Sequence, residues 1–364
     1  MEILVVVGTL SGIGGIETCV RTLAEEAEAN GDRVRVLALC PSVLDARWHQ
    51  GLAYTEVPNG SRSLRWQMLG GLPAVIRACK THPPDVVIVI YGSSILLVRL
   101  GLLLARLKRP VMAWLHFSTA HKQRTDFLRY AHGHICISSQ IAAATKKIVG
   151  IAAESVHLVY NGARIEAASA MARSTSGPLR LLHVGRLMVG RQKRTDDLLR
   201  ALALVEGDWR LDLIGTGEGE EDIAGLHALA EQLGIADRLN WLGWQSDPWR
   251  AVATADLLVL CSAFEGFPMV LIEALARGIP CLSSDCSSGP ADIILHGHNG
   301  WLYPVGDGGA LAGRIQHLVR DRTLLPPAHL VRESVRMFSS NMVFRRIRQA
   351  IENTIERFGR RRYA

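Results

Sequence analysis

The chain has 364 residues, more than one hydrophobic core usually organises, and 48% hydrophobic and 21% charged residues. The length predicts two domains, and the composition argues against disorder of the chain as a whole. The net charge is +7, of which +6 lies between residue 331 and the end, where nine arginines face three glutamates. Because so little charge is left elsewhere, the sequence does not indicate a basic face that binds nucleic acid.

No segment predicts secretion or membrane insertion. The seven cysteines are scattered and form no CxxC pair, which argues against a disulfide framework or a zinc site and fits a reducing cytoplasm. Residues 1–8 lack the basic start and cleavage site of a signal peptide and are interpreted as a buried strand. The apolar stretch 86–107 carries Arg99 and Arg106, whereas a spanning helix needs about 20 uninterrupted apolar residues. We therefore expect a cytoplasmic protein.

The first part of the chain alternates short apolar runs with longer amphipathic ones. Helices are predicted at 16–30, which ends before Gly31, and at 95–107. Strands are predicted at 3–7, 34–39, 86–90, 111–114, 135–137 and 156–159. Because these runs do not alternate with polar residues, we expect strands buried on both faces, in a parallel sheet covered by helices.

Small and polar residues at 166–178 end in Ser-Gly-Pro and form the predicted linker. A second series follows, with a helix at 195–205 and strands at 180–184, 209–214, 239–242, 257–261, 280–283 and 300–303. Two such series predict an α/β protein of two doubly wound, Rossmann-like domains, with a ligand cleft at the carboxyl ends of the strands. We place these domains at 1–168 and 177–338.

The remaining residues, 339–364, predict a basic helix. Val343, Ile347, Ile351, Ile355 and Phe358 recur at helical spacing and form an apolar stripe. A basic end suits an anionic membrane surface, where each Lys or Arg contributes ~1 kcal/mol. A solvated helix tail is the alternative.

A glycine-rich turn follows the first predicted strand and opens a helix, where backbone N–H groups can receive a phosphate. Gly12 and Gly14 fit the G-x-G-x-x-G pattern, but Glu17 stands where the third glycine belongs. This departure weakens the hypothesis of a nicotinamide-dependent dehydrogenase. A tight turn with a purely structural role is the alternative.

Two cations follow the strand predicted at 180–184. Arg186 comes directly after its end, and Lys193 lies seven residues further on. A guanidinium and an ammonium at the carboxyl end of a strand can bracket a diphosphate and neutralise it as a leaving group. Solvated loop cations are the alternative.

Two carboxylates flank the start of another predicted helix. Pro268 suits its first turn, and the free N–H groups of Met269 and Val270 would point at an anion. Glu265 precedes the helix, and Glu273 lies eight residues further, about 12 Å of helical rise. Carboxylates so placed can bind two hydroxyl-bearing parts of one ligand. The apolar neighbours of Glu273 predict a buried setting for it.

Together these motifs resemble family 4 glycosyltransferases, which are retaining enzymes of the GT-B fold. The resemblance implies two Rossmann-like domains facing across a cleft, a nucleotide-sugar donor, no cofactor and a last helix that packs back toward the N-terminal domain. It rests on the Gly14-Gly15-x-Glu17 turn, the Val184-Gly185-Arg186-Leu187 strand end with Lys193, the Gly215-Thr216-Gly217-Glu218 turn and the Glu-x7-Glu spacing of Glu265 and Glu273.

The resemblance also implies residue roles. Arg186 and Lys193 would bind the donor diphosphate, Glu265 the hydroxyls of the donor sugar, and Glu273 the ribose. His116, after the strand predicted at 111–114, would lie near the donor sugar and forms the catalytic pair with Glu265; a structural histidine is the alternative. His121 and Lys122 are further candidates for acceptor contacts. The implied donor-binding residues are Gly14, Gly15, Arg186, Lys193, Gly215, Phe267, Pro268, Met269, Val270 and Glu273.

Several strings resemble a narrower group, the lipopolysaccharide core 1,6-galactosyltransferases. The resemblance implies UDP-galactose as donor and a lipid-linked core oligosaccharide as acceptor. The strings lie at 114–122, 192–194, 243–245, 262–269 and 285–294. The alternatives are transfer of another hexose or N-acetylhexosamine to an exopolysaccharide or other glycan, a GT-B-like epimerase or phosphorylase, and a non-catalytic nucleotide-sugar-binding module.

No Asp-x-Asp motif occurs in the sequence, and the acidic run 220–222 is interpreted as a solvated loop instead of a metal site. The diphosphate would then be stabilised by Arg186, Lys193 and a helix N-terminus, which predicts transfer without a metal ion. Because no carboxylate is assigned to the anomeric face of the donor, we expect retention without a covalent intermediate.

Overall fold

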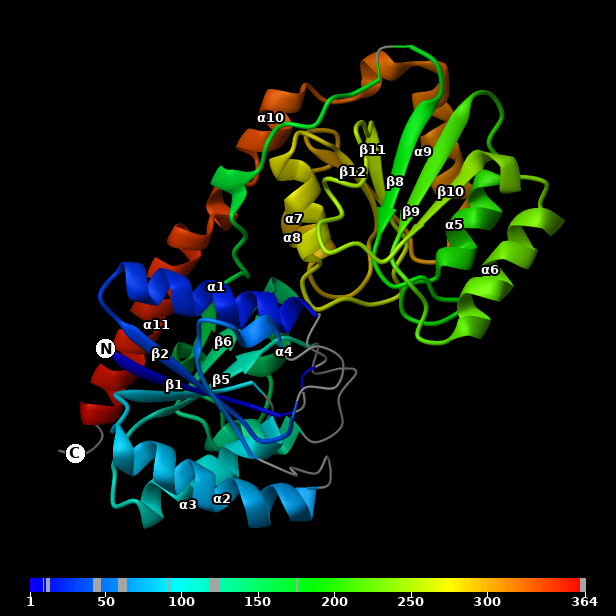
Figure 1. Ribbon diagram of the computed structural model, residues 1–364. Helices are drawn as coiled ribbons and strands as arrows, with labels where there is room; N and C mark the ends of the chain where they lie inside the picture. Colours follow the sequence, from blue (N-terminus) through cyan, green and yellow to red (C-terminus); the bar gives the residue numbers. More distant parts are fainter. Residues whose placement is uncertain are drawn as a thin grey trace. The chain divides into compact units, whose positions relative to one another are not determined.

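The computed structural model describes residues 1–8, 10, 14–41, 47–57, 64–90, 92–117, 125–174 and 176–360. The chain forms two compact units, each an α/β unit built on one parallel sheet (Figure 1). Unit 1 comprises Met1–Ala163 and Phe338–Ala364, and unit 2 comprises Arg164–Met337. Among the described residues, no helix is long and apolar enough to cross a membrane.

Unit 1 has a seven-stranded sheet in the order β3-β2-β1-β4-β5-β6-β7. Its strands are β1 (Glu2–Val7), β2 (Arg33–Ala38), β3 (Ala53–Glu56), β4 (Val86–Val89), β5 (Val111–Leu115), β6 (Gly133–Cys136) and β7 (Val156–Leu158). Its helices are α1 (Gly15–Ala29), α2 (Leu64–Thr81), α3 (Ile95–Leu104), α4 (Ser139–Lys146) and α11 (Ser340–Arg360). Figure 1 shows α1 and α11 on one side of this sheet and α2 and α3 on the other, which explains why β1 is almost wholly buried.

Unit 2 has a six-stranded sheet in the order β10-β9-β8-β11-β12-β13. Its strands are β8 (Leu179–Val184), β9 (Trp209–Ile214), β10 (Leu239–Gly243), β11 (Leu257–Leu260), β12 (Cys281–Ser284) and β13 (Gly300–Tyr303). Its helices are α5 (Thr195–Leu202), α6 (Glu220–Gln232), α7 (Met269–Ala276), α8 (Pro290–Ile293), α9 (Gly308–Arg320) and α10 (Ala328–Glu333). Leucines of β8, β9, α5 and α9 pack into one core between the sheet and its helices.

The strand order of each sheet reverses beside the first strand of that unit. In unit 1, β1 pairs with β2 and β4, and in unit 2, β8 pairs with β9 and β11, all in parallel. This order confirms the prediction of two doubly wound, parallel-sheet domains. In such sheets, ligands bind outside the carboxyl ends of the strands at the point of reversal, which directs attention to the loops after β8 and β11.

The segment 166–178, predicted as a linker, lies within unit 2 and is bonded to it. The Met171 N–H donates to the carbonyl of Arg277 over 2.9 Å, and the Ser174 N–H donates to the Asp256 carboxylate over 2.7 Å. These bonds attach the segment to unit 2, although most of its described residues are exposed.

Helix α11 belongs to unit 1, where it contacts α1 and β6. Three residues of its predicted apolar stripe, Val343, Ile347 and Ile351, are buried there. Arg348 forms an ion pair with Asp32 over 3.1 Å. These three residues are therefore part of the core of unit 1, while Ile355 and Phe358 are partly exposed.

Candidate active site

Two glycines bring the loops after β8 and β9 into contact. The Gly185 N–H donates to the carbonyl of Ile214 over 2.9 Å, and the Gly215 N–H donates to the carbonyl of Gly243 over 2.8 Å. Gly215 has a φ of 142°, and a Cβ atom there would lie 1.8 Å from the Gly185 carbonyl oxygen. Only glycine fits this approach. Gly215, a predicted donor-site residue, thus holds the Arg186 loop against the loop that carries Glu218.

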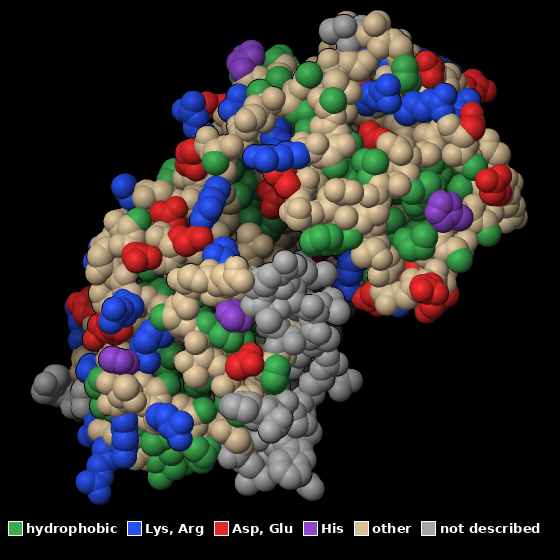
Figure 2. Space-filling model, in the orientation of Figure 1, with side chains coloured by type: hydrophobic (Ala, Val, Ile, Leu, Met, Phe, Trp, Pro, Cys, Tyr) green, Lys and Arg blue, Asp and Glu red, His purple; other side chains and the backbone are tan. Residues whose placement is uncertain are grey.

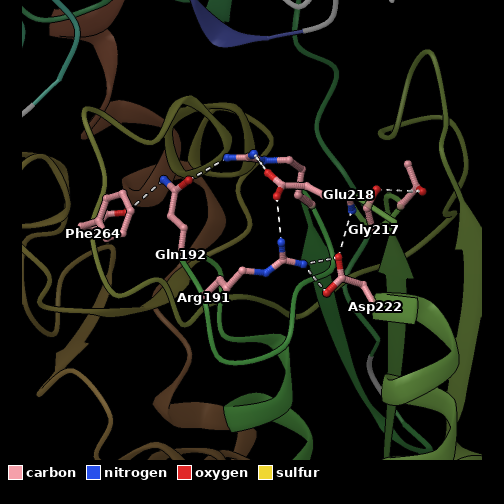
Figure 3. Close-up of polar contacts among 8 residues, drawn as sticks. Arg191, Gln192, Gly217, Glu218, Asp222 and Phe264 are labelled. Atoms are coloured by element: carbon pink, nitrogen blue, oxygen red, sulfur yellow. Dashed lines mark hydrogen bonds and ion pairs between the residues drawn. The ribbon is translucent and has the colours of Figure 1, made fainter. Parts of the chain in front are cut away.

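Arg186 projects from the end of β8 into a network of charges. Its guanidinium donates to Glu218 and, over 2.6 Å, to Oε1 of Gln192. Arg191 donates to the other oxygen of Glu218 over 3.0 Å, so this carboxylate lies between two guanidinium groups (Figure 3). Half of the Arg186 side chain is exposed, so it is accessible to a ligand while its orientation is fixed.

Asp222 corrects one prediction from the sequence. The acidic run 220–222 was expected to be solvated, but Asp222 is buried and accepts hydrogen bonds from Arg191 and from the Glu218 N–H (Figure 3). The bond from Arg191 lowers the pKa of the Asp222 carboxyl. The run begins α6, so its third residue turns inward while Glu220 and Glu221 stay exposed. In the described part of the chain, no group of three or more His, Cys, Asp or Glu side chains could hold a metal ion.

Lys193 and Glu265 form a largely buried ion pair at the reversal point of the sheet. The Lys193 ammonium donates to Oε1 of Glu265 over 2.6 Å, and the Ser262 hydroxyl donates to the same oxygen over 2.6 Å. The two side chains are 15% and 8% exposed. Backbone contact reinforces the pair, because the Ala263 N–H donates to the carbonyl of Gln192 over 2.8 Å. The ammonium has further donors that an anionic ligand can use.

Helix α7 presents its N-terminus beside this pair. Pro268 was predicted in the first turn of the helix, but it is the N-cap residue, one position earlier. No side chain caps the helix. Met269 and Val270, which follow, are partly exposed. The N–H groups of a helix's first turn have no partner within the helix, so they can bind an anion. Gly289 has a φ of 103°, and a Cβ there would lie 2.6 Å from Cδ of Pro268, so a second loop fits tightly under Pro268 and the buried Phe267.

Glu273 lies one turn further along α7. It accepts a hydrogen bond from the Trp249 indole N–H over 3.1 Å, and the guanidinium of Arg277 lies over the Trp249 ring at 4.4 Å. Burial raises the pKa of the Glu273 carboxyl, and the Trp249 bond and the nearby Arg277 charge oppose that rise. Glu273 is partly exposed, whereas its neighbours Leu271, Ile272, Ala274 and Leu275 are buried, so its predicted buried setting holds only in part. Sequence reasoning did not single out Trp249, because its loop carries no motif.

The other predicted site residues lie in unit 1. Gly14 is the N-cap of α1 and has no side chain to cap it, and a Cβ on Gly15 would meet no atom within 4 Å. His116 follows β5 directly, is 5% exposed, and its ring contacts the Trp114 ring with centroids 4.6 Å apart. Gly12, His121 and Lys122 lie outside the described residues.

The structure therefore gathers most predicted residues on one edge of unit 2. The set comprises Arg186, Lys193, Gly215, Glu265, Phe267, Pro268, Met269, Val270 and Glu273, and it combines two cations, an uncapped helix N-terminus and two carboxylates. Such a combination suits a ligand that carries both phosphates and hydroxyls. Glu218, Gln192 and Asp222 join the site as the partners that orient Arg186 and Arg191.

Comparison with known proteins agrees with this chemistry. A family model described as Glycosyltransferase Family 4 matches residues 13–167, and one described as Glycosyl transferases group 1 matches residues 166–336. A lipopolysaccharide 1,6-galactosyltransferase of Escherichia coli (strain K12) is 31% identical over 98% of this chain and 99% of its own length. The chain is a family 4 glycosyltransferase.

Solved structures place the glycosyltransferase in the GT-B class, as predicted. The apo form of the lipopolysaccharide outer core galactosyltransferase WaaB has a TM-score of 0.85 at 31% identity, over 97% of this chain and 99% of that one. HepE of Anabaena, solved with UDP-glucose, has a TM-score of 0.78 at 22% identity, over 97% of this chain and all of its own. The second likeness supports the fold alone.

Proposed function

We propose that the enzyme transfers galactose from UDP-galactose, with retention of configuration, to a lipopolysaccharide core or other lipid-linked oligosaccharide. The proposal rests on one edge of unit 2, which carries the cations Arg186 and Lys193 and the uncapped N-terminus of α7. Glu265 precedes this helix, and Glu273 lies within it. The end-to-end similarity to a lipopolysaccharide 1,6-galactosyltransferase supports galactose and the core acceptor. Seven buried free thiols fit a cytoplasmic enzyme.

The diphosphate of the donor would bind Arg186, Lys193 and the N–H groups of Met269 and Val270. In the free enzyme, Arg186 contacts Glu218 and Lys193 contacts Glu265, so phosphate oxygens would share or replace those carboxylates. Gly14 and Gly15 are assigned to the diphosphate by the family resemblance. Since charge develops on the departing diphosphate, these donors stabilise the transition state, and we propose that no metal ion is needed.

The two carboxylates would position the rest of the donor. Glu273, beside Trp249, accepts hydrogen bonds from the ribose hydroxyls, and Glu265 accepts them from the sugar hydroxyls. Because Glu265 is held by Lys193 and Ser262 in one orientation, it is already in place when the donor arrives. This arrangement favours recognition of a hexose by its hydroxyl pattern.

The proposed mechanism keeps the acceptor on the face from which UDP departs. Double displacement would need a carboxylate beneath the anomeric carbon. Glu265 is engaged with the Lys193 ammonium and is assigned to the distal hydroxyls, and His116 is assigned by the resemblance to the donor sugar. With no carboxylate assigned to the opposite face, the leaving diphosphate and the acceptor hydroxyl react on the same face, and configuration is retained.

The test is a donor screen with purified full-length enzyme and deacylated core oligosaccharide. UDP-galactose, UDP-glucose and UDP-N-acetylglucosamine are compared by UDP release, with and without acceptor, and UDP binding is measured by titration calorimetry. We expect the fastest acceptor-dependent release from UDP-galactose. Faster release from another donor would reassign the sugar, and UDP binding without turnover of any donor would favour a non-catalytic binding module.

A further inference from the structure

Helix α3 of unit 1 has an apolar face that is turned outward. Its leucine face comprises Leu96, Leu100, Leu103 and Leu104, which are 37%, 36%, 71% and 50% exposed. These positions follow one another at helical spacing, while Ile95, Leu97, Val98 and Leu102 bury the opposite side in unit 1. Surface helices normally turn polar residues outward, and a group of exposed leucines marks an interaction surface.

Basic residues border the leucine face. Arg99 lies on α3, and Arg106 and Lys108 follow its end; all three are exposed. Between Glu56 and Asp126 the sequence has ten Lys or Arg residues and one acidic residue, Asp85, which gives this stretch a charge of +9. Figure 2 shows basic and apolar side chains together along the lower edge of unit 1, over the region where Figure 1 draws α2 and α3.

The C-terminal helix α11, by contrast, packs against other elements of unit 1. Val343, Ile347 and Ile351 of its apolar stripe are buried, and Ile355 and Phe358 are partly buried. Arg348 pairs with Asp32, and Arg357 donates to the carbonyl of His132 over 3.0 Å. The predicted membrane contact of the tail would therefore rest on a few outward arginines without an apolar partner. Helix α3 combines both features on one surface.

We propose that the leucine face of α3 attaches the enzyme to an anionic lipid bilayer. The leucines enter the boundary between headgroups and acyl chains, while Arg99, Arg106 and Lys108 contact anionic headgroups. Helix α3 has 10 residues, so it lies in the interface and does not span the bilayer. A second copy of the chain fits less well, because a two-fold contact would place the same basic rim against itself.

Flotation of the full-length enzyme with vesicles tests this surface. The vesicles are phosphatidylcholine alone or with about 30 mol% phosphatidylglycerol, the lipid charge on which basic segments depend. We expect binding to the anionic vesicles only, reduced on the order of tenfold by Leu100→Gln/Leu103→Gln and similarly by Arg106→Gln/Lys108→Gln. Leu204→Gln is the matched control, because Leu204 is 67% exposed on unit 2 and lies outside the leucine face.

The outcomes separate this inference from the proposed function. Turnover of the soluble deacylated acceptor should be unchanged in both double variants, because the variants change no residue of the unit 2 site. Equal vesicle binding by Leu100→Gln/Leu103→Gln and wild type would overturn the inference, as would loss of binding only in a variant with Arg360, Arg361 and Arg362 neutralised. A dimer of the wild type that dissociates in the leucine variant would assign the face to self-association instead.

Discussion

Removal of the Lys193 ammonium should destabilise unit 2 as well as weaken donor binding. Lys193 is 15% exposed and lies 2.6 Å from Glu265, which is 8% exposed, so Lys193→Met leaves a buried carboxylate with Ser262 as its remaining partner. Breaking such a pair costs about 3–5 kcal/mol, and because Ser262 still donates we expect about 3 kcal/mol. Affinity for UDP should fall by about 1.5–3 kcal/mol through loss of a charge-assisted hydrogen bond.

A double-mutant cycle identifies the cause. Glu265→Gln removes the stranded charge, so the double variant should be more stable than the sum of the single effects by about 2 kcal/mol. Stability is measured by native-state hydrogen exchange of peptides from β8 and β11, which reports on unit 2 alone. Arg250→Met is the control, because its ion pair with Asp247 is exposed and its loss should cost about 0.5 kcal/mol or less. Additive single effects would refute the reasoning.

Three further predictions concern pH and metal ions. Burial raises the pKa of Glu273 from its usual 4.5, so the stability contributed by this group falls as pH rises through the raised value. Glu273→Gln should therefore match wild type near pH 4, exceed its stability at higher pH, and bind UDP more weakly by calorimetry; a variant that is less stable at the higher pH would contradict this. Burial lowers the pKa of His183 from 6.5 to about 4, so unit 2 should lose stability as pH falls between these values. His183→Asn should reduce that loss in hydrogen exchange of unit 2, and an equal loss in both proteins would exclude His183 as its source. Turnover should persist in EDTA, and restoration by Mn²⁺ of activity that EDTA had abolished would disprove transfer without a metal.

Much of the sheet could be predicted because buried parallel strands are continuous apolar runs. The strands predicted at 209–214 and 300–303 have the observed bounds of β9 and β13. Strand β3, Ala53–Glu56, was not predicted; it lies at the sheet edge and is mostly exposed. An edge strand with polar side chains has no apolar run that reveals it.

Site residues could be predicted where they follow a strand end or flank a helix start in the sequence. They could not be predicted where the site depends on contacts between residues far apart in the sequence. Arg186 and Lys193 follow a strand end, and Glu265 and Glu273 flank a helix start, so their sequence context indicates them. Asp222 meets Arg191 across 31 residues, a contact that depends on how the loops after β8 and β9 fold together.

The distribution of positive charge along the chain also could not be interpreted without the fold. The net count assigned almost all of the positive charge to the tail, because acidic residues elsewhere offset the basic stretch that includes α3. The structure shows that Leu103, Arg106 and Lys108 are all exposed at and just after the end of α3, so the same residues define a surface.

The anomeric configuration of the product tests the central claim most directly. The enzyme is incubated with UDP-galactose, whose galactose is α-linked, and deacylated core oligosaccharide, and the coupling constant of the new anomeric proton is measured by NMR. The account predicts an α-galactoside, because we propose that Arg186, Lys193 and the N-terminus of α7 hold the diphosphate on the face that the acceptor enters. A β-galactoside, or an α-galactoside formed through a galactosylated peptide that mass spectrometry can trap, would contradict it.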